Sequence, residues 1–490
     1  MSSRWDSIDL TPMFRAGMPI RRKDRLNQNF MYDLLEHRVM DTGLQPLDSA
    51  LAFSADVDIP AASFPHPNLM MGETHTILAS ASKFFNMTFD GSVWQAVEIT
   101  TGLTPAGTDV WHFADKGDHW LATNGVDMVF CKDGVYSSEY TKVPNTVCTF
   151  RGRVYAGGLG GNTSRANAEF WNTSYIALLE ELIADIYPDA TTSKFGQNAV
   201  FYSCVGGEDF FEHYAESPSL DKIVAYQRRR ESGYSIMPWS GKVMMVKPLG
   251  DGVVVYGANG ITFMLQALSP ISMQLTNLPH EGVPSRRAVA GDRFRHVFIG
   301  NSGSLFEIGP DLKIKELGYE EVVADIGTLA NTLINYDPIY QDIYLGIASK
   351  SRLITPNGMS RLNKSWTTMC RDRGKNRGFY ITISSTPSSI ATTGVITFPN
   401  NRLGTVHGLR LNTKDPSKHS VVFSVRPNEA DGWKNLTAVT PDAGGFCDVL
   451  VSTYQVQVTV TTDTTVAAVP IEGATLFYDT KPRYGLKELL

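Results

Sequence analysis

Short apolar runs, each followed by a glycine-containing turn and a second apolar run, recur through the middle of the sequence. Three copies lie at residues 119–130, 253–265 and 296–308, and a weaker copy lies at residues 352–362. Asn-Gly between apolar strands favours a hairpin with a type I′ turn, in which both central residues have positive φ. The pattern therefore predicts a series of antiparallel β-hairpins over residues 91–370.

Hairpins that repeat with no regular helices between them are typical of β-propeller blades. At about 40–50 residues for each blade, residues 91–370 predict a propeller of about six blades. A large irregular β-sandwich is the alternative for this region. An apolar stripe with helical spacing at residues 174–187, ended by Pro188, predicts one helical insertion. Such a helix either covers a local apolar surface or docks onto a partner.

The two ends of the chain have different patterns. Residues 1–90 are rich in Pro, Asp, Ser and Met and predict an extended N-terminal arm, with one short helical pattern at residues 30–35. The charged, glycine-containing residues 371–378 predict a domain boundary. Alternation of apolar and polar residues over 379–490 predicts a C-terminal β-sandwich. The predicted fold class is all-β: an arm, a propeller and a sandwich.

Composition limits the classes of protein that fit. The chain has 490 residues, 42% hydrophobic and 19% charged, which indicates a folded protein of more than one domain. A net charge of −6 argues against a general neutraliser of nucleic acid. No apolar run approaches the ~20 residues of a membrane span, and the N-terminus lacks the order of a signal peptide, so we expect folding in a cytoplasm. Five scattered cysteines without a CxxC pair indicate isolated apolar thiols.

Motifs that carry enzyme chemistry are absent from the sequence. There is no Gly-x-Ser-x-Gly elbow, and the glycine-rich residues 157–161 open no helix and lack a following Lys-Ser/Thr. Four side chains that cluster in the sequence would point to different sides of a strand and turn, whereas a metal needs converging ligands; they are Glu208, Asp209, Glu212 and His213. His280-Glu281 is a weaker pair of the same kind. We therefore predict no catalytic, metal or cofactor site.

The propeller region resembles a family of phage proteins. The segments that carry the resemblance are residues 111–125, 149–158, 201–203, 208–211, 237–241 and 283–292. They are similar to the tail nozzle and packaged-DNA stabilisation proteins of short-tailed bacteriophages, and the similarity covers about residues 60–370. The resemblance implies a ring, commonly a hexamer, that lies below the portal and the head-to-tail adaptor. Genomic DNA would pass through the ring without sequence recognition.

Two basic groups are candidate contacts for a neighbouring subunit or for DNA. They are Arg21, Arg22 and Lys23 in the arm, and Arg228, Arg229 and Arg230 in the propeller region. A solvated loop is the simpler interpretation of such charge runs. In a ring they would pair with acidic groups of a partner or with phosphate. Subunit contact is the favoured interpretation, because fixed phosphate clamps would hinder DNA ejection.

These patterns together predict a structural virion protein of a phage tail, assembled in the host cytoplasm, that forms a nozzle or hub and is not an enzyme. The alternative is a receptor-binding or glycan-degrading tail component on a propeller scaffold. Glycan cleavage needs two carboxylates about 5–10 Å apart, which a sequence does not reveal. Aromatic side chains exposed together on the C-terminal sandwich would favour receptor binding.

Overall fold

The computed structural model describes residues 5–19, 30–47, 68–161, 196–203, 233–362 and 366–480, with short gaps inside these ranges. The helical insertion predicted at residues 174–187 lies outside the described residues. The described residues form many small sheets in which nearly all strand pairs are antiparallel, and this confirms the predicted all-β fold class. Within these ranges, no helix is long and apolar enough to cross a membrane.

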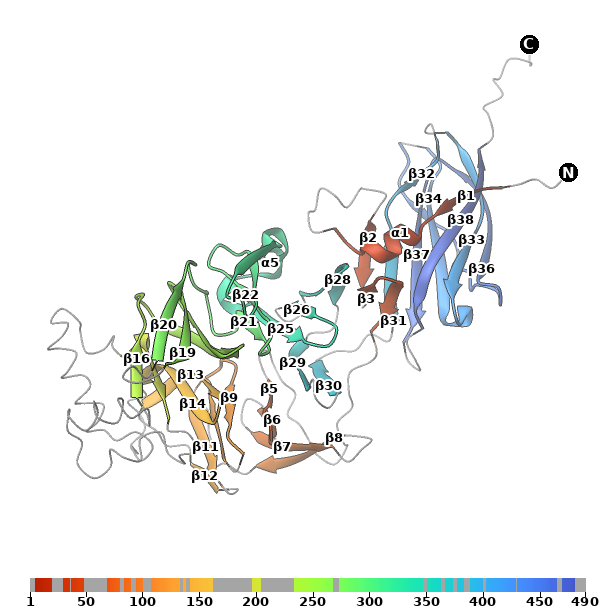
Figure 1. The fold of residues 1–490 in the computed structure, drawn as a ribbon. Coiled ribbons are helices and arrows are strands. Elements are labelled where there is room, and N and C mark those ends of the chain that lie inside the picture. Colours follow the sequence, from red (N-terminus) through yellow and green to blue (C-terminus); the bar gives the residue numbers. More distant parts are fainter. Residues whose placement is uncertain are drawn as a thin grey trace, which may run out of the picture. The chain divides into compact units, whose positions relative to one another are not determined.

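The chain divides into two compact units, whose strands are labelled in Figure 1. Unit 1 comprises Met1–Ala50, Tyr340–Ser365 and Ser384–Leu490. Unit 2 comprises Leu51–Ile339 and Trp366–Ile383. The chain therefore passes between the two units several times.

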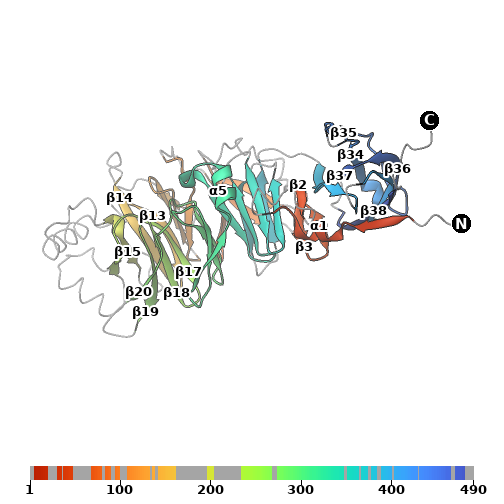
Figure 2. The ribbon, with the colours of Figure 1, turned by 90° about the horizontal axis from the view of Figure 1, so that it is seen from above.

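Unit 2 contains five four-stranded antiparallel sheets, each made of four consecutive strands. Figure 2 shows the third and the fourth of them side by side. The first contains β5 (Asn68–Met71), β6 (Thr76–Ala79), β7 (Phe84–Phe89) and β8 (Trp94–Ile99). The second contains β9 (His112–Asp115), β10 (His119–Thr123), β11 (Met128–Lys132) and β12 (Val135–Ser137). The third contains β13 (Lys142–Phe150), β14 (Arg153–Gly161), β15 (Ala199–Tyr202) and β16 (Gly233–Ile236). The fourth contains β17 (Val243–Leu249), β18 (Gly252–Gly257), β19 (Ile261–Gln266) and β20 (Met273–Leu278). The fifth contains β21 (Val289–Gly291), β22 (His296–Ile299), β23 (Leu305–Ile308) and β24 (Ile314–Gly318).

The last elements of unit 2 return to its first sheet. They are α5 (Glu320–Ile326), a 3-10 turn at Leu329–Asn331, β25 (Leu333–Asp337), β29 (Trp366–Asp372) and β30 (Arg377–Thr382). Another 3-10 turn, Gly196–Asn198, precedes β15. Strand β25 lies beside β21 and β29, and β29 lies beside β5. The first strands of the early sheets, β5, β9, β13 and β17, are also neighbours in that order.

The predicted hairpins are present. Strands β10–β11, β18–β19 and β22–β23 pair as expected from residues 119–130, 253–265 and 296–308. Their predicted type I′ geometry is wrong. Thr123 pairs with Met128, so the first loop has four residues, and within it only Gly125 has a positive φ, of 86°. Asn124 closes this loop instead, because its Oδ1 accepts the backbone N–H groups of Val126 and Asp127.

Aromatic and branched side chains fill the space between the sheets of unit 2. Phe84 packs edge-on against Trp111, with ring centroids 4.8 Å apart, and lies beside Trp120. Every residue of β18 is buried, as expected for an inner strand that is covered on both faces. Cys131 and Cys148 lie in these cores and Cys447 is buried in unit 1; all three are free thiols, as the sequence predicts for isolated cysteines.

Unit 1 contains two sheets. The first has the order β3 (His37–Met40), β4 (Gly43–Pro46), β38 (Ile471–Thr480), β33 (Gly404–Thr413) and β36 (Phe446–Thr453), and β1 (Asp6–Asp9) also pairs with β38. The second is a ten-stranded sheet, and its strands within unit 1 are, in order, β26 (Asp342–Gly346), β27 (Ser351–Thr355), β28 (Gly358–Leu362), β2 (Met31–Leu35), β31 (Ser388–Thr393), β37 (Gln455–Asp463), β34 (His419–Arg426) and β35 (Lys434–Asn435). Strand β32 (Ile396–Thr397) also pairs with β37, helix α1 spans Thr11–Ala16, and a 3-10 turn spans Pro416–Lys418.

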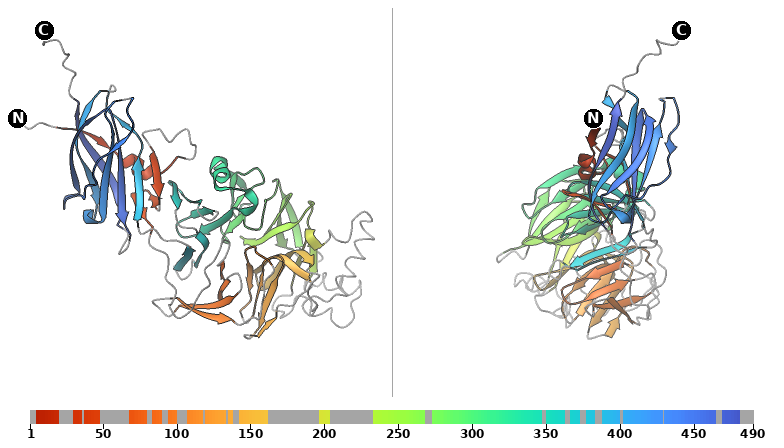
Figure 3. Two further views of the ribbon diagram at one scale, coloured as in Figure 1. Left: turned by 180° about the vertical axis from the view of Figure 1, so that it is seen from behind. Right: turned by 90° about the vertical axis from the view of Figure 1, so that its right-hand side faces the viewer.

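The described part of residues 1–90 is not an extended arm. Strands β1, β3 and β4 extend the first sheet of unit 1, and β2 lies between β28 and β31 in the second. Figure 3 shows these N-terminal strands, in red, beside the C-terminal strands, in blue. The helical pattern at residues 30–35 corresponds to strand β2. Strands β1 and β2 pair with strands hundreds of residues away, so no local turn signal marks them, whereas β3 and β4 form a hairpin with each other.

The boundary expected at residues 371–378 also differs. Strands β29 and β30 pair across it, from Asp372 with Arg377 to Trp366 with Thr382, and both belong to unit 2. The fourth predicted hairpin, β27–β28, is present, but it belongs to unit 1 instead of the propeller region. Its two central residues are Pro356 and Asn357, since Thr355 pairs with Gly358. A polar Gly-containing stretch marks a hairpin loop as readily as a linker.

Candidate functional site

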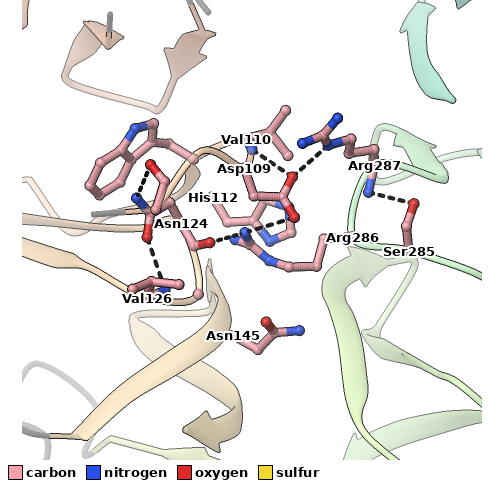
Figure 4. A network of polar contacts seen from close by, with 12 residues as sticks. Asp109, Val110, His112, Asn124, Val126, Asn145, Ser285, Arg286 and Arg287 are labelled. Carbon is pink, nitrogen blue, oxygen red and sulfur yellow. Dashed lines mark hydrogen bonds and ion pairs between the residues drawn. The ribbon is translucent and has the colours of Figure 1, made fainter. Parts of the chain in front are cut away.

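The basic residues predicted as contacts lie outside the described residues. This applies to Arg21, Arg22, Lys23, Arg228, Arg229 and Arg230, and also to the acidic cluster at residues 208–213. In the part of the chain that the structure describes, no group of three His, Cys, Asp or Glu side chains is arranged to hold a metal. The most elaborate polar arrangement in unit 2 is a different one, around Arg286 (Figure 4).

Arg286 lies between β20 and β21 and reaches the β10–β11 turn. Its Nη2 donates to the carbonyl oxygen of Thr123 over 3.0 Å, and its Nη1 donates to that of Asn124. The residue is only 4% exposed. A buried guanidinium is costly unless its charge is paired and its protons are used. Two backbone carbonyls from another sheet use two of those protons.

Asp109 supplies the negative charge of the network. The Nε of Arg287 donates to its Oδ1 over 2.6 Å, and the Nη1 of Arg286 lies 3.7 Å from its Oδ2. Burial alone would raise the pKa of Asp109, but the charge of Arg286 and the hydrogen bond from Arg287 hold it below its ordinary value. Burial lowers the pKa of Arg286 to about 10, although Asp109 opposes the shift. Both groups are therefore charged at neutral pH.

Strand β13 continues the network. The Nδ2 of Asn145 donates to the carbonyl of Val243 over 2.7 Å, which joins β13 to β17. The next residue, Thr146, bonds the Nδ1 of His112 over 2.8 Å and accepts the N–H of Val246 over 3.2 Å. Burial lowers the pKa of His112 well below its ordinary value, so its ring is neutral. The network thus connects the second, third and fourth sheets with the segment that enters the fifth.

This arrangement suits a fixed connection better than a reaction. A general base needs access to a substrate and a pKa near the working pH. His112 is buried and uncharged, and the carboxylate of Asp109 is held ionised by two arginines. The hydrogen bonds of Arg286, Asn145 and Thr146 instead join one sheet to another. Charged hydrogen bonds of this kind fix the relative positions of the elements that they connect.

Several segments that carry the phage resemblance contact one another. Arg286, from residues 283–292, bonds the turn at residues 123–124. The Nη1 of Arg153, in residues 149–158, donates to the carbonyl of Ser203 over 2.6 Å. The polar residues of these motifs therefore connect or close sheets. Arg286 and Arg287 lie within one of the resembling segments, which predicted no role for them. Their signal in the sequence is a pair of arginines inside an otherwise apolar segment.

The His280-Glu281 pair is used locally. The ring of His280 packs edge-on against Phe298 and Phe306, with centroids 5.1 and 4.5 Å away. Glu281 accepts the backbone N–H of Ser302 over 2.5 Å. Burial lowers the pKa of His280. The pair therefore supports the β22–β23 turn, and its two side chains point to different partners.

Neither a protein family nor a curated protein matches the sequence. Among solved structures, PorZ, a surface component of the type-IX secretion system of Porphyromonas gingivalis, is 8% identical over 79% of this chain, with a TM-score of 0.36. The match covers 46% of PorZ, so the chain spans about half of that protein's length. AztD from Citrobacter koseri is 11% identical over 79% of this chain and 89% of its own, with a TM-score of 0.33. The WD40 domain of Neurospora crassa Pan2 is 8% identical over 67% of this chain and 86% of its own, with a TM-score of 0.34. These values are too low to relate the functions of the proteins.

Proposed function

We propose that the protein is a structural component of a bacteriophage tail, a ring-forming nozzle or hub that extends or closes the DNA channel below the portal and adaptor. The proposal rests on the resemblance of residues 60–370 to propeller-bearing nozzle and DNA-stabilisation proteins. Its partners would be further copies of itself, the adaptor, other tail proteins and the passing genome.

The proposed architecture is a propeller followed by a sandwich. Five four-stranded sheets of unit 2 would be blades, and β25 with the β29–β30 hairpin would fill the remaining arc, which gives a ring of about six blades. The position of β29 beside β5 supports closure, because a propeller brings its last blade against its first. The two sheets of unit 1, each with alternating buried positions, would be the sandwich.

The structural observation that supports the proposal is the Arg286 network. The charged side chains of this network contact other sheets of the same unit, and Arg286 is only 4% exposed to solvent. Such internal bonds favour a stiff block, which a mechanical part of a tail requires. They also argue against a DNA passage through unit 2 itself, since buried side chains lie where its sheets meet. The channel would lie between copies of the protein.

Two measurements test this proposal. Native mass spectrometry of the purified protein, alone and with the adaptor, should detect a closed oligomer, with six copies as the expected number. Electron micrographs of virions labelled with an antibody should place the protein at the tail. A protein that stays monomeric with the adaptor and is absent from particles is not a nozzle.

We also expect no hydrolysis of polysaccharide, peptide or nucleic acid by the purified protein. Turnover that is abolished by one Asp or Glu substitution would show that the protein is an enzyme instead.

A further inference from the structure

Aromatic side chains gather on the outer face of the first sheet of unit 1. Buried and partly exposed residues alternate at the start of β33, so that His407 points away from the face on which Val406 is buried. Strand β38 does the same, with Phe477 between the buried Leu476 and Tyr478. Trp5, immediately before β1, is brought to this face by the pairing of β1 with β38. Residues from the two ends of the sequence thus meet on one surface.

These rings form a continuous row. Trp5 stacks on His407 with centroids 4.7 Å apart and an interplanar angle of 7°. Phe477 meets the edge of Trp5 at 6.3 Å, and Phe446 of β36 lies 5.9 Å from Phe477. The rings come from three strands, β38, β33 and β36, and from the residue that precedes β1. We call these four residues the Trp5 row.

The row combines exposure with fixed geometry. Trp5 is 43% exposed, although one side of its ring is covered by His407. The Nε2 of His407 lies 3.0 Å from the Oδ2 of Asp479, so the carboxylate orients the imidazole ring. A positioned aromatic ring loses little conformational freedom when a ligand stacks on it. This is the arrangement of a binding platform.

Hydrogen-bonding groups surround the row. The side chain of Asp479 is 38% exposed. On the same face, Arg410 and Asp448 are exposed, and the hydroxyls of Thr405 and Ser452 lie 3.0 Å apart. Binding sites for small ligands typically join aromatic surface to a few convergent polar groups. Carboxylates accept hydrogen bonds from hydroxyls, and guanidinium groups donate to them.

We propose that the Trp5 row binds a neutral glycan chain. The exposed face of Trp5 would stack on the apolar C–H face of a sugar ring, and the flanking carboxylates and Arg410 would bond its hydroxyls. The charged groups beside the row are the carboxylates of Asp448 and Asp479 and the guanidinium of Arg410, so this surface carries no excess of positive charge. It therefore suits a neutral ligand and disfavours an anionic one. The row crosses several strands, which fits an oligosaccharide better than one sugar. The inference does not rest on the assignment to a phage tail.

The full-length protein should be titrated by calorimetry with maltohexaose, cellohexaose, N-acetylchitohexaose and mannohexaose, and with oligogalacturonate as the anionic comparison. We expect at least one neutral hexaose to bind. Trp5→Ala should weaken that binding at least about tenfold, because an aromatic anchor of an interface typically contributes that much or more. Trp433→Ala is the matched control, since Trp433 is 41% exposed in the same unit but lies beside β35 of the other sheet. It should bind as the wild type does.

Melting curves and a second variant keep loss of binding separate from loss of folding. His407→Ala should also weaken binding, because Trp5 loses the ring on which it stacks. Wild-type affinity in Trp5→Ala, no binding of any neutral hexaose, or tighter binding of oligogalacturonate would each overturn the proposal. So would concentration-dependent self-association that Trp5→Ala abolishes, because a second copy of the chain would then occupy the row.

Discussion

Two glycines show that the same residue type is required for different reasons. Gly125 has a φ of 86°, and a Cβ there would also lie 2.7 Å from the Oδ1 of Asn145. Gly260 has no positive φ, but a Cβ would lie 2.4 Å from the Cδ1 of Trp239. Both follow an Asn, so the sequence treats them alike. Only the structure separates backbone conformation from crowding.

We therefore expect Gly125→Val and Gly260→Val each to lower the free energy of unfolding by about 1–3 kcal/mol, from strain or overpacking. Gly117→Ala isolates the backbone cost, because Gly117 has a φ of 91° and open space around it. Gly432→Ala is the control, with neither constraint. Urea unfolding measures all four variants. Wild-type stability in both valine variants would show that the hairpin turns are wrongly assigned.

Buried histidines make the protein sensitive to acid. Burial lowers the pKa of His37 and of His419 to about 4, and that of His296 to about 3. His296 uses both nitrogens in its neutral form: Nδ1 accepts from the hydroxyl of Tyr256 over 2.8 Å, and Nε2 donates to the carbonyl of Pro248 over 2.9 Å. Protonation would break the first of these bonds.

Because the folded-state pKa values lie below the unfolded value of 6.5, the unfolded chain binds more protons between pH 6.5 and about 3. Stability should be complete above pH 6.5 and fall as the pH decreases through this window. Each such histidine contributes about 1.4 kcal/mol per pH unit. His296→Gln should reduce the slope of unfolding free energy against pH by up to one proton, with the packing cost read at pH 7.5. An unchanged slope would mean that His296 binds its proton equally well in the folded and unfolded chains.

At the scale of elements, the Arg286 network should behave as a coupled unit. Asp109→Asn removes the carboxylate beside the buried Arg286, and we expect a loss of about 3 kcal/mol, the lower end for a buried pair, because Asp109 itself is 34% exposed. Arg286→Met removes the buried charge together with two hydrogen bonds and should cost about 1–3 kcal/mol. The double variant should cost less than the sum of the two, since removal of both charges leaves neither unpaired.

The exposed pair Arg151–Asp251 is the control for this cycle. Its side chains are 48% and 77% exposed, so Asp251→Asn should change stability by less than about 1 kcal/mol. Additive losses for Asp109 and Arg286 in denaturant unfolding would refute the coupling. The network would then be two separate contacts.

Local pattern predicted the hairpins but could not predict which sheet each strand joins. The pairs β10–β11 and β18–β19 follow from neighbouring residues, because a hairpin forms within a dozen positions. The pairing of β1 with β38 spans almost the whole chain and depends on complementary edges that no local period records. The same limit applies to Arg286 and Asn124, which are 162 positions apart. Motif similarity indicated that these segments matter, but not that they touch.

At the scale of the whole molecule, the described N-terminal residues belong to the core of unit 1. Leu10, Phe14, Met31 and Leu34 are fully buried there. Each such side chain contributes about 1.5–3 kcal/mol through burial. Together they approach the 5–15 kcal/mol that keeps a typical domain folded. An extended arm would be dispensable for folding, whereas this burial predicts that unit 1 needs its N-terminal strands.

Deletion of residues 1–50 should therefore unfold unit 1 and leave unit 2 folded. It removes β1, β2, β3 and β4, which exposes the paired edges of β38 and β31, while every strand of unit 2 lies outside the deletion. Calorimetry of the full chain should show transitions from both units, and the truncated chain should lose one of them. Limited proteolysis should then cut within residues 384–490 first.

As a milder control, Asp33→Asn removes the ion pair with Arg361 between β2 and β28. This variant should only lower the temperature of the unit 1 transition. If the truncated chain keeps both transitions, the N-terminal strands are accessories to a sheet that is stable without them; if it loses both, unit 2 depends on unit 1 for its own stability.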